Sequence, residues 1–551
     1  MKKTALSCLI SVVCSLSAQA YQQDKTYHLT VLHTNDLHGR FYHNEKGEGG
    51  LAAQKTVIDR IKKEVEAKGG STIVLSAGDF NTGIAESSLQ NARPDIEGMN
   101  AIGYEALTLG NHEFDNPLPL LEKQKQWAKF PFLAANIHYK KQGKGPMFPV
   151  DPYTILHKQD LKIAVVGLTT TDTATSANPA HTRDFTFLNP QEVSKEIGSL
   201  LEETEKPDIK IALTHLGYYE NGLHGDKAPG DVSLARALPA KTFDMIIGGH
   251  THDTVCMDNQ GHWNKHYQPG EPCRPDFQNG TWIMQAGEWG KYVGRADFEF
   301  KNGELTLKNY QLIPINLKKE VKDAEGKKTY VTYQEAIPAD PQLAALLDQY
   351  QHKGDELLGV KVGHTNGRLE GERKIIRFQQ TNLGKLFAYV QMQKVGADLS
   401  VVNSGGVRDS IEAGDVTYKD VLKVAPFGNT ITYVELTGAE LEKYLQVVGL
   451  KRVDSGGYAQ FAGVSMLVDW QHQTVSDIKI QGKPLNPRQK YRLAVSNFCA
   501  IGGSGYPVLT QYPSYVDTGY VDADVLKEFF EQNSPLDVKR FAPNNEIIYK
   551  N

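Results

Sequence analysis

The sequence predicts an α/β fold with two domains, and three observations lead to this prediction. The chain has 551 residues, which is more than a single hydrophobic core usually serves. Between residues 27 and 300, short apolar runs rich in β-branched residues alternate with stretches of helical periodicity. Beyond residue 359, segments of strand and helix character mix again. Continuous apolar runs of this kind are typical of strands buried between layers of helices.

The composition excludes several classes of protein. Hydrophobic residues make up 40% of the chain and charged residues 23%, which argues against disorder and against a protein with many membrane spans. The formal net charge is -5, whereas nucleic-acid-binding proteins carry a clear excess of Lys and Arg. We therefore expect no nucleic acid polymer as a partner. An anionic small molecule would have to meet positive charge that is concentrated locally.

Residues 1–20 have the pattern of a cleavable secretory signal peptide. Lys2 and Lys3 precede a mostly apolar run, and the run ends in the small-x-small pattern of residues 18–20. The apolar run is too short for a spanning helix, and no later stretch approaches the length of one. We expect a mature chain that begins at Tyr21, is exported to the periplasm and has no transmembrane segment.

The cysteines fit an exported protein. Neither Cys8 nor Cys14 follows the kind of sequence that lipoprotein processing needs. We therefore favour a protein that is free in the periplasm over a lipid-anchored one. Cys256 and Cys273 flank a loop rich in Gly, Pro and Asn, and in an oxidising compartment they are the natural disulfide pair. Cys499 is left over, and we interpret it as a small buried hydrophobic residue.

The first half of the chain contains the clearest strand candidates. Each is a short run of apolar residues, and the five clearest are residues 28–32, 72–75, 162–166, 209–213 and 245–247.

A helix is predicted between the two halves. Asp340 is a good N-cap, and Pro341 suits the first helical position. Leu343 and Leu347 then repeat at helical spacing. We interpret residues 339–358 as a linker helix between domains, although the pattern favours an ordinary peripheral helix nearly as strongly.

Five polar turns each follow an apolar strand candidate. They read Asn35-Asp36-Leu37-His38, Gly78-Asp79, Gly110-Asn111-His112-Glu113, Thr214-His215 and Gly249-His250-Thr251-His252. In open α/β sheets, ligand sites collect beyond the carboxyl ends of the strands, so we expect these side chains to meet in one crevice. Imidazole, carboxylate and amide donors without a thiolate favour Zn, Mn, Fe, Co or Mg. Each turn alone is weak evidence, because such short patterns are mostly unrelated to metals.

The order of these turns resembles that of the calcineurin-like metallophosphoesterases. The strings VLHTNDLHGRF and YEALTLGNHEFD resemble the two signatures of the secreted 5'-nucleotidase family, and the resemblance covers essentially the whole mature chain. It implies an N-terminal metallophosphoesterase sandwich that a linker helix joins to a mixed α/β C-terminal 5'-nucleotidase domain. The implied parts are a signal peptide at residues 1–20, a dinuclear-metal domain at 21–338, a linker helix at 339–358 and a nucleotide-binding domain at 359–551.

The resemblance also implies two divalent metal ions, whose identity among Zn, Mn, Co and Mg stays open. One ion would be held by Asp36, His38, Asp79 and His252, and the other by Asp79, Asn111, His215 and His250. Bacterial relatives carry Gln at the position of His252 in some cases, which could alter the metal preference while preserving the site.

The same resemblance implies the catalytic residues. A metal-bridged hydroxide would attack phosphorus, and His112 would stabilise the transition state or protonate the leaving oxygen. Asp115 would orient the imidazole of His112. The alternative is that His112 and Asp115 form a capping pair at the start of a helix.

The substrate-binding residues are expected in the second domain. Matching positions for the anionic groups, the base and the sugar are Arg373, Arg377, Arg408, Asn403, Phe427, Phe498 and Ser504. Without the resemblance, the arginines would read as solvated charges and the phenylalanines as core residues. Ser504 stands where the family's GGDGY string has Asp, so an uncharged hydroxyl replaces a carboxylate that binds the ribose.

The expected function is metal-dependent hydrolysis of nucleoside 5'-monophosphates, and of nucleoside di- and triphosphates and UDP-sugars as well. Two alternatives stay open. One is a 2',3'-cyclic-nucleotide phosphodiesterase/3'-nucleotidase, against which Asp115 argues because that group more often carries Asn there. The other is a non-enzymatic periplasmic nucleotide-binding receptor, which would not need seven metal-ligand side chains. We favour a monomer.

Overall fold

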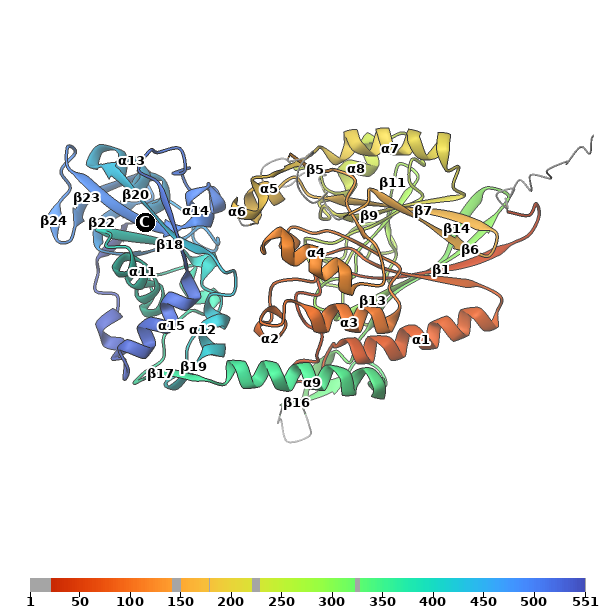
Figure 1. Ribbon diagram of the computed structural model, residues 1–551, viewed down its shortest axis with the longest axis horizontal. Coiled ribbons are helices and arrows are strands. Elements are labelled where there is room, and N and C mark those ends of the chain that lie inside the picture. The colour runs from red at the N-terminus through yellow and green to blue at the C-terminus, as the bar shows by residue number, and fades with distance from the viewer. Residues whose placement is uncertain (1–20, 141–149, 178, 221–227, 323–327, 551) are drawn as a thin grey trace, which may run out of the picture.

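A computed structural model describes residues 21–140, 150–177, 179–220, 228–322 and 328–550. The predicted signal peptide at residues 1–20 lies outside the described residues. Two domains of mixed helix and sheet lie side by side, and helix α9 (Pro341–Leu358) runs along the first domain toward the second (Figure 1). No helix within the described residues is long and apolar enough to cross a membrane.

The first domain is built on two six-stranded sheets. The strands of the first sheet, in spatial order, are β14 (Glu304–Pro314), β13 (Tyr292–Lys301), β1 (Tyr27–Thr34), β2 (Ser71–Ser76), β3 (Ala106–Thr108) and β4 (Phe132–Leu133). The strands of the second sheet are β11 (Asp276–Gln278), β12 (Thr281–Met284), β10 (Met245–Ile247), β9 (Ile209–His215), β7 (Leu161–Thr169) and β6 (Tyr153–Lys158). Two smaller ribbons pair β5 (Ile137–Tyr139) with β8 (Phe185–Phe187), and β15 (Lys318–Lys322) with β16 (Lys328–Thr332). The five predicted strands are confirmed as β1, β2, β7, β9 and β10.

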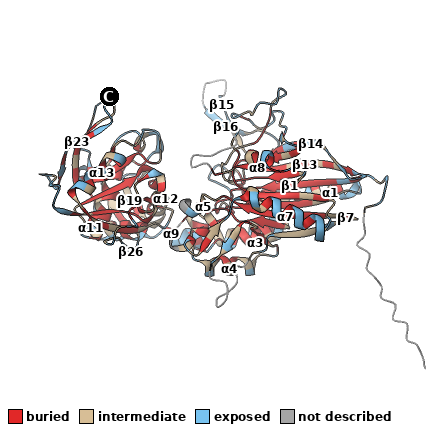
Figure 2. Cartoon of the chain, turned by 90° about the horizontal axis from the view of Figure 1, so that it is seen from above, coloured by how far each residue is buried: buried red, intermediate tan, exposed pale blue. Residues whose placement is uncertain are grey.

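Helices cover both outer faces of this sandwich. The main ones on the first sheet are α1 (Leu51–Ala67), α3 (Arg93–Ile102) and α4 (Leu118–Trp127), and those on the second sheet are α7 (Pro190–Thr204) and α8 (Asp231–Ala237). Short helical turns lie at α2 (Ala85–Ser88), η1 (His112–Phe114), α5 (Thr173–Ser176) and α6 (Pro179–Thr182). Side chains of β1, such as Val31, pack between the two sheets, while neighbours such as Leu32 pack under the helices. Strands buried on both faces explain the continuous apolar runs in the sequence, and these strands form the buried centre of Figure 2.

The second domain has a mixed five-stranded sheet. Its strands, in order, are β21 (Ala459–Ala462), β18 (Leu399–Asn403), β25 (Lys490–Ser496), β20 (Thr430–Thr437) and β26 (Val516–Val521). The other strands are β24 (Lys483–Pro484), β23 (Thr474–Ile480), β22 (Val464–Asp469) and β27 (Ile547–Lys550) in one sheet, and β17 (Lys361–Thr365) with β19 (Gly414–Thr417) in another. The helices and helical turns are α10 (Arg373–Ile376), α11 (Asn382–Lys394), η2 (Ser404–Gly406), α12 (Tyr418–Val424), α13 (Gly438–Gly449), α14 (Asn497–Ala500), η3 (Gly503–Gly505), α15 (Asp522–Gln532) and η4 (Val538–Phe541). Strand β18 pairs parallel with β25 and antiparallel with β21, so the predicted mixed α/β domain is confirmed.

The predicted helix before the second domain is confirmed as α9. The Asp340 carboxylate accepts a hydrogen bond from the Leu343 N–H at 2.9 Å, and Pro341 occupies the first turn. Leu343 and Leu347 are buried in the hydrophobic core that α1 and α3 share with the first sheet. The helix is therefore packed as part of the first domain, and the predicted domain boundaries themselves stay a prediction.

Two features outside the sheets also follow the sequence. The disulfide between Cys256 and Cys273 is present, as predicted, and Cys499 is buried as a free thiol. At the junction of the domains, Lys419 on α12 forms an ion pair with Glu86 on α2 at 2.6 Å. This pair joins the two domains at the side where α9 runs.

Asp95 on α3 provides a test of how burial affects stability. Its side chain is fully buried and accepts a hydrogen bond from the Ser87 hydroxyl, and burial raises its pKa to about 7. An unfolded Asp titrates near its ordinary value of 3.8, so the folded state holds the proton more tightly. The free energy of unfolding therefore falls as the pH rises from about 4 to about 7.

We expect Asp95→Asn to remove this part of the pH dependence. Between pH 5 and pH 8 the Asp95 carboxyl should cost the wild type about 2 to 3 kcal/mol of unfolding free energy, because one pKa unit corresponds to about 1.4 kcal/mol. The variant should not show this loss. Urea unfolding at both pH values measures the difference. Asp477→Asn, at an exposed position, is the control, and an equal gain in that variant would contradict the role of burial.

Candidate metal centre and substrate cleft

The polar turns predicted from the sequence lie at one edge of the sandwich. Parallel pairing of β1, β2 and β3, and of β9 and β10, places their carboxyl ends side by side. Five residues of these turns have positive φ, which an L-residue adopts at some cost: Asp36, His38, Asp79, His250 and His252. The backbone there is bent sharply to aim the side chains at a common point.

Glycine is required at three of these turns. A Cβ on Gly110 would lie 2.1 Å from Asp79 Oδ1, and one on Gly249 would lie 2.9 Å from Asp36 Oδ2. Gly78 has φ of 87°, and a Cβ there would lie 2.7 Å from the Thr108 carbonyl oxygen. The backbone therefore approaches its neighbours so closely at these positions that only glycine fits.

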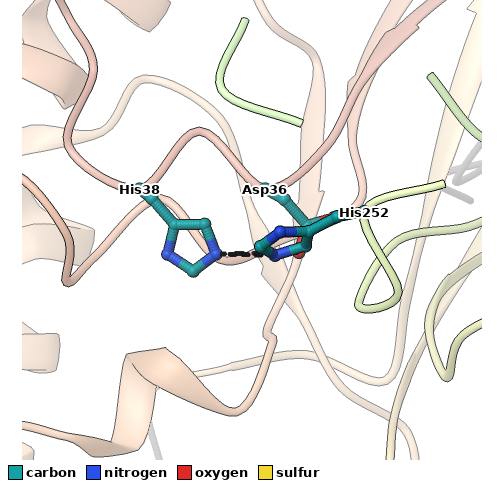
Figure 3. A group of neighbouring side chains, drawn as sticks. All are labelled: Asp36, His38 and His252. Atoms are coloured by element: carbon teal, nitrogen blue, oxygen red, sulfur yellow. Dashed lines mark hydrogen bonds and ion pairs between the residues drawn. The ribbon is translucent and has the colours of Figure 1, made fainter. Parts of the chain in front are cut away.

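Asp36, His38 and His252 form a first group of donor atoms (Figure 3), which all lie within 4.8 Å of one another. His252 Nε2 lies 3.0 Å from His38 Nε2 and 3.2 Å from Asp36 Oδ1. Two imidazole nitrogens and a carboxylate oxygen thus converge on one point. Such convergence is what a bound cation needs.

Asp79, His215 and His250 form a second group, whose donor atoms also lie within 4.8 Å of one another. Asn111 joins it, because its Oδ1 lies 2.8 Å from His250 Nδ1. Asp79 Oδ2 is 2.9 Å from His215 Nε2 and 3.8 Å from His38 Nε2, so this carboxylate lies between the two groups. The structure thus brings together all seven residues predicted as metal ligands.

The proton positions of two imidazoles indicate that these groups suit divalent cations. Nδ1 of His215 lies 2.6 Å from the Ala77 carbonyl oxygen, and Nδ1 of His38 lies 2.7 Å from that of Thr82. A carbonyl only accepts, so Nδ1 carries a hydrogen in both rings and Nε2 is the atom that faces the site. His215 Nε2 is buried 2.9 Å from Asp79 Oδ2. An imidazole nitrogen beside a carboxylate oxygen is a suitable pair of ligands for Zn, Mn, Co or Mg.

The electrostatics of the site agree with a cation-binding role. Burial by itself raises the pKa of Asp36 and Asp79, but the surrounding imidazoles hold both values below the ordinary range. Burial lowers the pKa of His38 to about 4. Burial also lowers the pKa of His215 and His252, but the neighbouring carboxylates outweigh it and raise the values to about 9 and about 10. The site therefore holds ionised carboxylates beside imidazoles of both charge states.

Glu113 was missed by the sequence reasoning. Its buried carboxylate accepts hydrogen bonds from the backbone N–H groups of Asp79 and Gly110, at 3.0 and 2.7 Å, and from those of Phe80 and Asn81 at 3.1 and 3.2 Å. The turn after β2 and the turn after β3 are thus both held by the Glu113 side chain. A signal was present, because an acidic residue within GNHE must find donors if the turn is buried.

His112 and Asp115 form a hydrogen-bonded pair beside the two groups. The His112 Nδ1–H donates to Asp115 Oδ2 at 2.5 Å, and the His112 backbone N–H donates to Asp79 Oδ1 at 2.9 Å. Burial lowers the pKa of His112, but Asp115 and Asp79 outweigh it and raise the value to about 10. With His38 and Asp79, His112 also forms a third set of donor atoms that lie within 4.8 Å of one another.

A cavity of about 170 Å³ lies between the two domains. Its lining comes from the first domain through His112, Asp115 and Ala177, and from the second through Asn403, Gly405, Gly406, Phe427, Asn429, Phe498 and Ser504. The structure therefore brings the predicted catalytic pair together with the predicted base and sugar residues. Asn429 was not predicted.

The three predicted arginines cluster beside this cavity and do not line it. Burial and the charge of Arg373 lower the pKa of Arg408, and the same two causes act on Arg377. The Arg408 guanidinium lies 5.5 Å from the centre of the Phe427 ring. Ser504, in a left-handed conformation with φ of 55°, accepts a hydrogen bond from Asn403 Nδ2 at 3.4 Å. Three positively charged side chains thus lie next to the side of the cavity that Phe427 lines.

Comparisons with known proteins agree with this geometry. Residues 29–254 match the calcineurin-like phosphoesterase family, and residues 361–511 match the 5'-nucleotidase C-terminal domain family. "Protein UshA" of Yersinia enterocolitica is 56% identical over 97% of this chain and 96% of its own. A "5'-nucleotidase" of Vibrio cholerae is 54% identical over 97% of this chain and 95% of its own. The 5'-nucleotidase precursor of Thermus thermophilus has a similar structure, with a TM-score of 0.69 at 26% identity over 95% of this chain and 100% of its own.

The sandwich and its two donor groups define a calcineurin-like metallophosphoesterase. Together with the second domain, they define an enzyme that hydrolyses phosphoric monoesters. The chain belongs to the 5'-nucleotidase family. Neither the cyclic phosphodiesterase nor the nucleotide receptor considered from the sequence is favoured by these relatives.

We expect Glu113→Ala to destabilise the metal-free protein by roughly 3 kcal/mol, because several buried N–H groups lose their acceptor. Urea unfolding in the presence of a chelator measures this loss. Glu196→Ala, on the exposed face of α7, should change the free energy of unfolding by less than about 0.5 kcal/mol. Equal stability of Glu113→Ala and the wild type would show that Glu113 does not hold the turns.

Proposed function

We propose that this enzyme hydrolyses nucleoside 5'-monophosphates to nucleosides and phosphate in the cleft between its domains. Nucleoside di- and triphosphates and UDP-sugars are further substrates in this proposal. One observation carries it: His112 and Asp115 face the same cavity as Phe427 and Phe498. A nucleotide has a phosphate at one end and a planar base at the other, so one cavity can hold both ends. The names of the relatives at 54 to 56% identity support the same substrate class.

The donor groups support two divalent ions. One would be held by Asp36, His38, Asp79 and His252, and the other by Asp79, Asn111, His215 and His250. Such ions would supply Lewis-acid activation of water and of the phosphate ester. Zn, Mn, Co and Mg all suit these donors.

His112 acts on the phosphate in this proposal. Its Nδ1–H is committed to Asp115, so the ring is fixed and Nε2 is the atom that can donate to an oxygen of the substrate. A donor held in place beforehand stabilises charge that develops on the phosphoryl group, or protonates the leaving oxygen, without reorganisation during the reaction. Asp115 serves as the positioning residue.

The second domain recognises the rest of the nucleotide. Phe427 and Phe498 stack on the base, which every nucleobase permits because each has a π-face. Arg373, Arg377 and Arg408 attract the anionic groups, and their proximity to one another is tolerated because a phosphate compensates the charge. Asn403 and Ser504 contact the sugar or base from the same wall.

The reaction takes place in the periplasm in this proposal. Residues 1–20 carry the features of a signal peptide, and the disulfide of Cys256 and Cys273 suits an oxidising compartment.

A substrate panel tests the proposal. Phosphate release is measured from AMP, 3'-AMP, 2',3'-cAMP and UDP-glucose, each with Mn²⁺, Zn²⁺, Co²⁺, Mg²⁺ or chelator. We expect AMP to be hydrolysed with metal and not with chelator. Preferred hydrolysis of 3'-AMP would overturn the assignment, and nucleotide binding without turnover under every metal would overturn the hydrolytic activity.

We expect His112→Ala to lower kcat for AMP by about 10² to 10⁴-fold, because a positioned acid or charge-stabilising group is lost. Metal content, measured by mass spectrometry of the purified protein, should stay at the wild-type level. The exposed His472→Ala variant is the control. Loss of metal in His112→Ala would show that His112 is a ligand instead.

We expect Ser504→Asp to increase discrimination between AMP and 2'-deoxy-AMP. A carboxylate accepts hydrogen bonds from ribose hydroxyls more strongly than a serine hydroxyl does, by about 1 kcal/mol or several-fold in KM. The ratio of kcat/KM for the two nucleotides measures the effect. Ser410→Asp, in the same domain and outside the cavity lining, should leave that ratio unchanged. An unchanged ratio in Ser504→Asp would remove Ser504 from sugar recognition.

A further inference from the structure

The three donors of the first group differ in how firmly their surroundings hold them. The side chain of Asp36 is 0% exposed and that of His38 is 8% exposed, whereas His252 is 34% exposed. A side chain that is one-third exposed is less restrained by packing than one that is buried. The position of His252 therefore depends more on its specific contacts.

One of these contacts is a charged hydrogen bond to Glu288. His252 Nδ1 lies 2.7 Å from Glu288 Oε2 while its Nε2 faces Asp36 and His38. An ionised carboxylate only accepts, so Nδ1 carries a hydrogen, and Nε2 is the ring atom that would face a bound ion. His38 and His215 instead donate to backbone carbonyls. A carboxylate is the stronger acceptor and makes the imidazole a more basic ligand.

Glu288 is itself held in place by neighbours outside the metal centre. Its Oε1 accepts a hydrogen bond from Lys291 Nζ at 2.6 Å. The same Lys291 lies 4.2 Å from the centre of the Trp289 ring, and the Arg40 guanidinium lies 3.8 Å from it. The Trp289 backbone N–H donates to the Asp36 carbonyl oxygen at 2.7 Å. The segment that carries Glu288 is thus tied to the turn that carries two of the donors.

The backbone of this segment is preformed. Gly287, Trp289 and Gly290 all have positive φ, at 72°, 59° and 65°. A Cβ on Gly290 would lie 2.3 Å from Gln54 Nε2, so the turn is closely packed against α1. Such a turn aims the Glu288 carboxylate before any ion binds.

We propose that Glu288 is a positioning residue for the first metal ion, which it supports by fixing the tautomer and ring orientation of His252. This inference rests on the proposed dinuclear function. Without the carboxylate, the partly exposed imidazole can rotate away and the ion loses one ligand. The second group, with Asp79, His215 and His250, does not contact Glu288 through a described hydrogen bond or ion pair, and its ion is retained.

The test is a metal titration of the full-length metal-free protein. Isothermal titration calorimetry with Mn²⁺ measures the affinity of each site, and the visible spectrum with Co²⁺ reports the ligands. We expect Glu288→Ala to weaken one of the two sites by 10- to 100-fold and to change the cobalt spectrum. Glu288→Gln should be closer to the wild type, because the amide oxygen can still accept from Nδ1–H. His252→Ala should weaken the same site at least as much.

Glu299→Ala is the matched control. Glu299 likewise pairs with a lysine, Lys308 at 2.8 Å, and lies 3.8 Å from His28 Nδ1, but it belongs to β13 far from the donor groups. Two ions bound with wild-type affinity and spectrum by Glu288→Ala would overturn the inference. If Glu288→Ala fails to fold, Glu288→Leu, which keeps side-chain bulk but cannot accept a hydrogen bond, takes its place: a weakening of one site by 10-fold or more supports the inference, and wild-type binding at both sites overturns it.

The titration also separates this inference from the proposed function. If the wild-type protein binds two ions but does not hydrolyse AMP, the proposed function is refuted. The metal titration of the Glu288 variants then still decides whether Glu288 supports the first ion. A wild-type protein that binds no divalent ion would refute both.

Discussion

The geometry of the candidate metal centre depends on one buried carboxylate, that of Glu113. Parallel strands bring their ends together, but the turns beyond them contain several residues in conformations that are costly for a polypeptide. Glu113 offsets that cost by accepting hydrogen bonds from the turns after β2 and β3 at once. Burial of an acidic side chain is itself unfavourable, and the backbone N–H groups compensate for it. The donor atoms of Asp79 and Asn111 can converge because their turns share this support.

Much of the fold was predictable because the relevant signals are local. The apolar runs of β1 and β7 report burial on both faces, and Asp340 and Pro341 report the start of α9 through capping geometry. The five polar turns were predictable as a set because their residue types and order are specific. The same reasoning found Cys256 and Cys273 from loop composition.

The remaining features arise from contacts between segments far apart in the sequence. Glu288 supports His252 across 36 positions, and nothing near Glu288 in the sequence marks it as a partner of that residue. Asn429 gains significance only because the second domain turns one wall toward His112. Likewise, the clustering of Arg373, Arg377 and Arg408 beside the cavity appears only in the folded domain. Local patterns cannot report such relations, because they depend on how two domains face each other.

The packing of α9 determines where the chain can be divided. Leu343 and Leu347 lie in the core of the first domain, and β17 of the second domain begins at Lys361. Only Gly359 and Val360 separate the helix from that strand, and Val360 is 55% exposed. The two domains therefore meet along the chain at a joint of two residues that belongs to neither hydrophobic core. A cut at this joint would leave the core that α9 shares with α1 and α3 whole on one side and every strand of the second domain on the other.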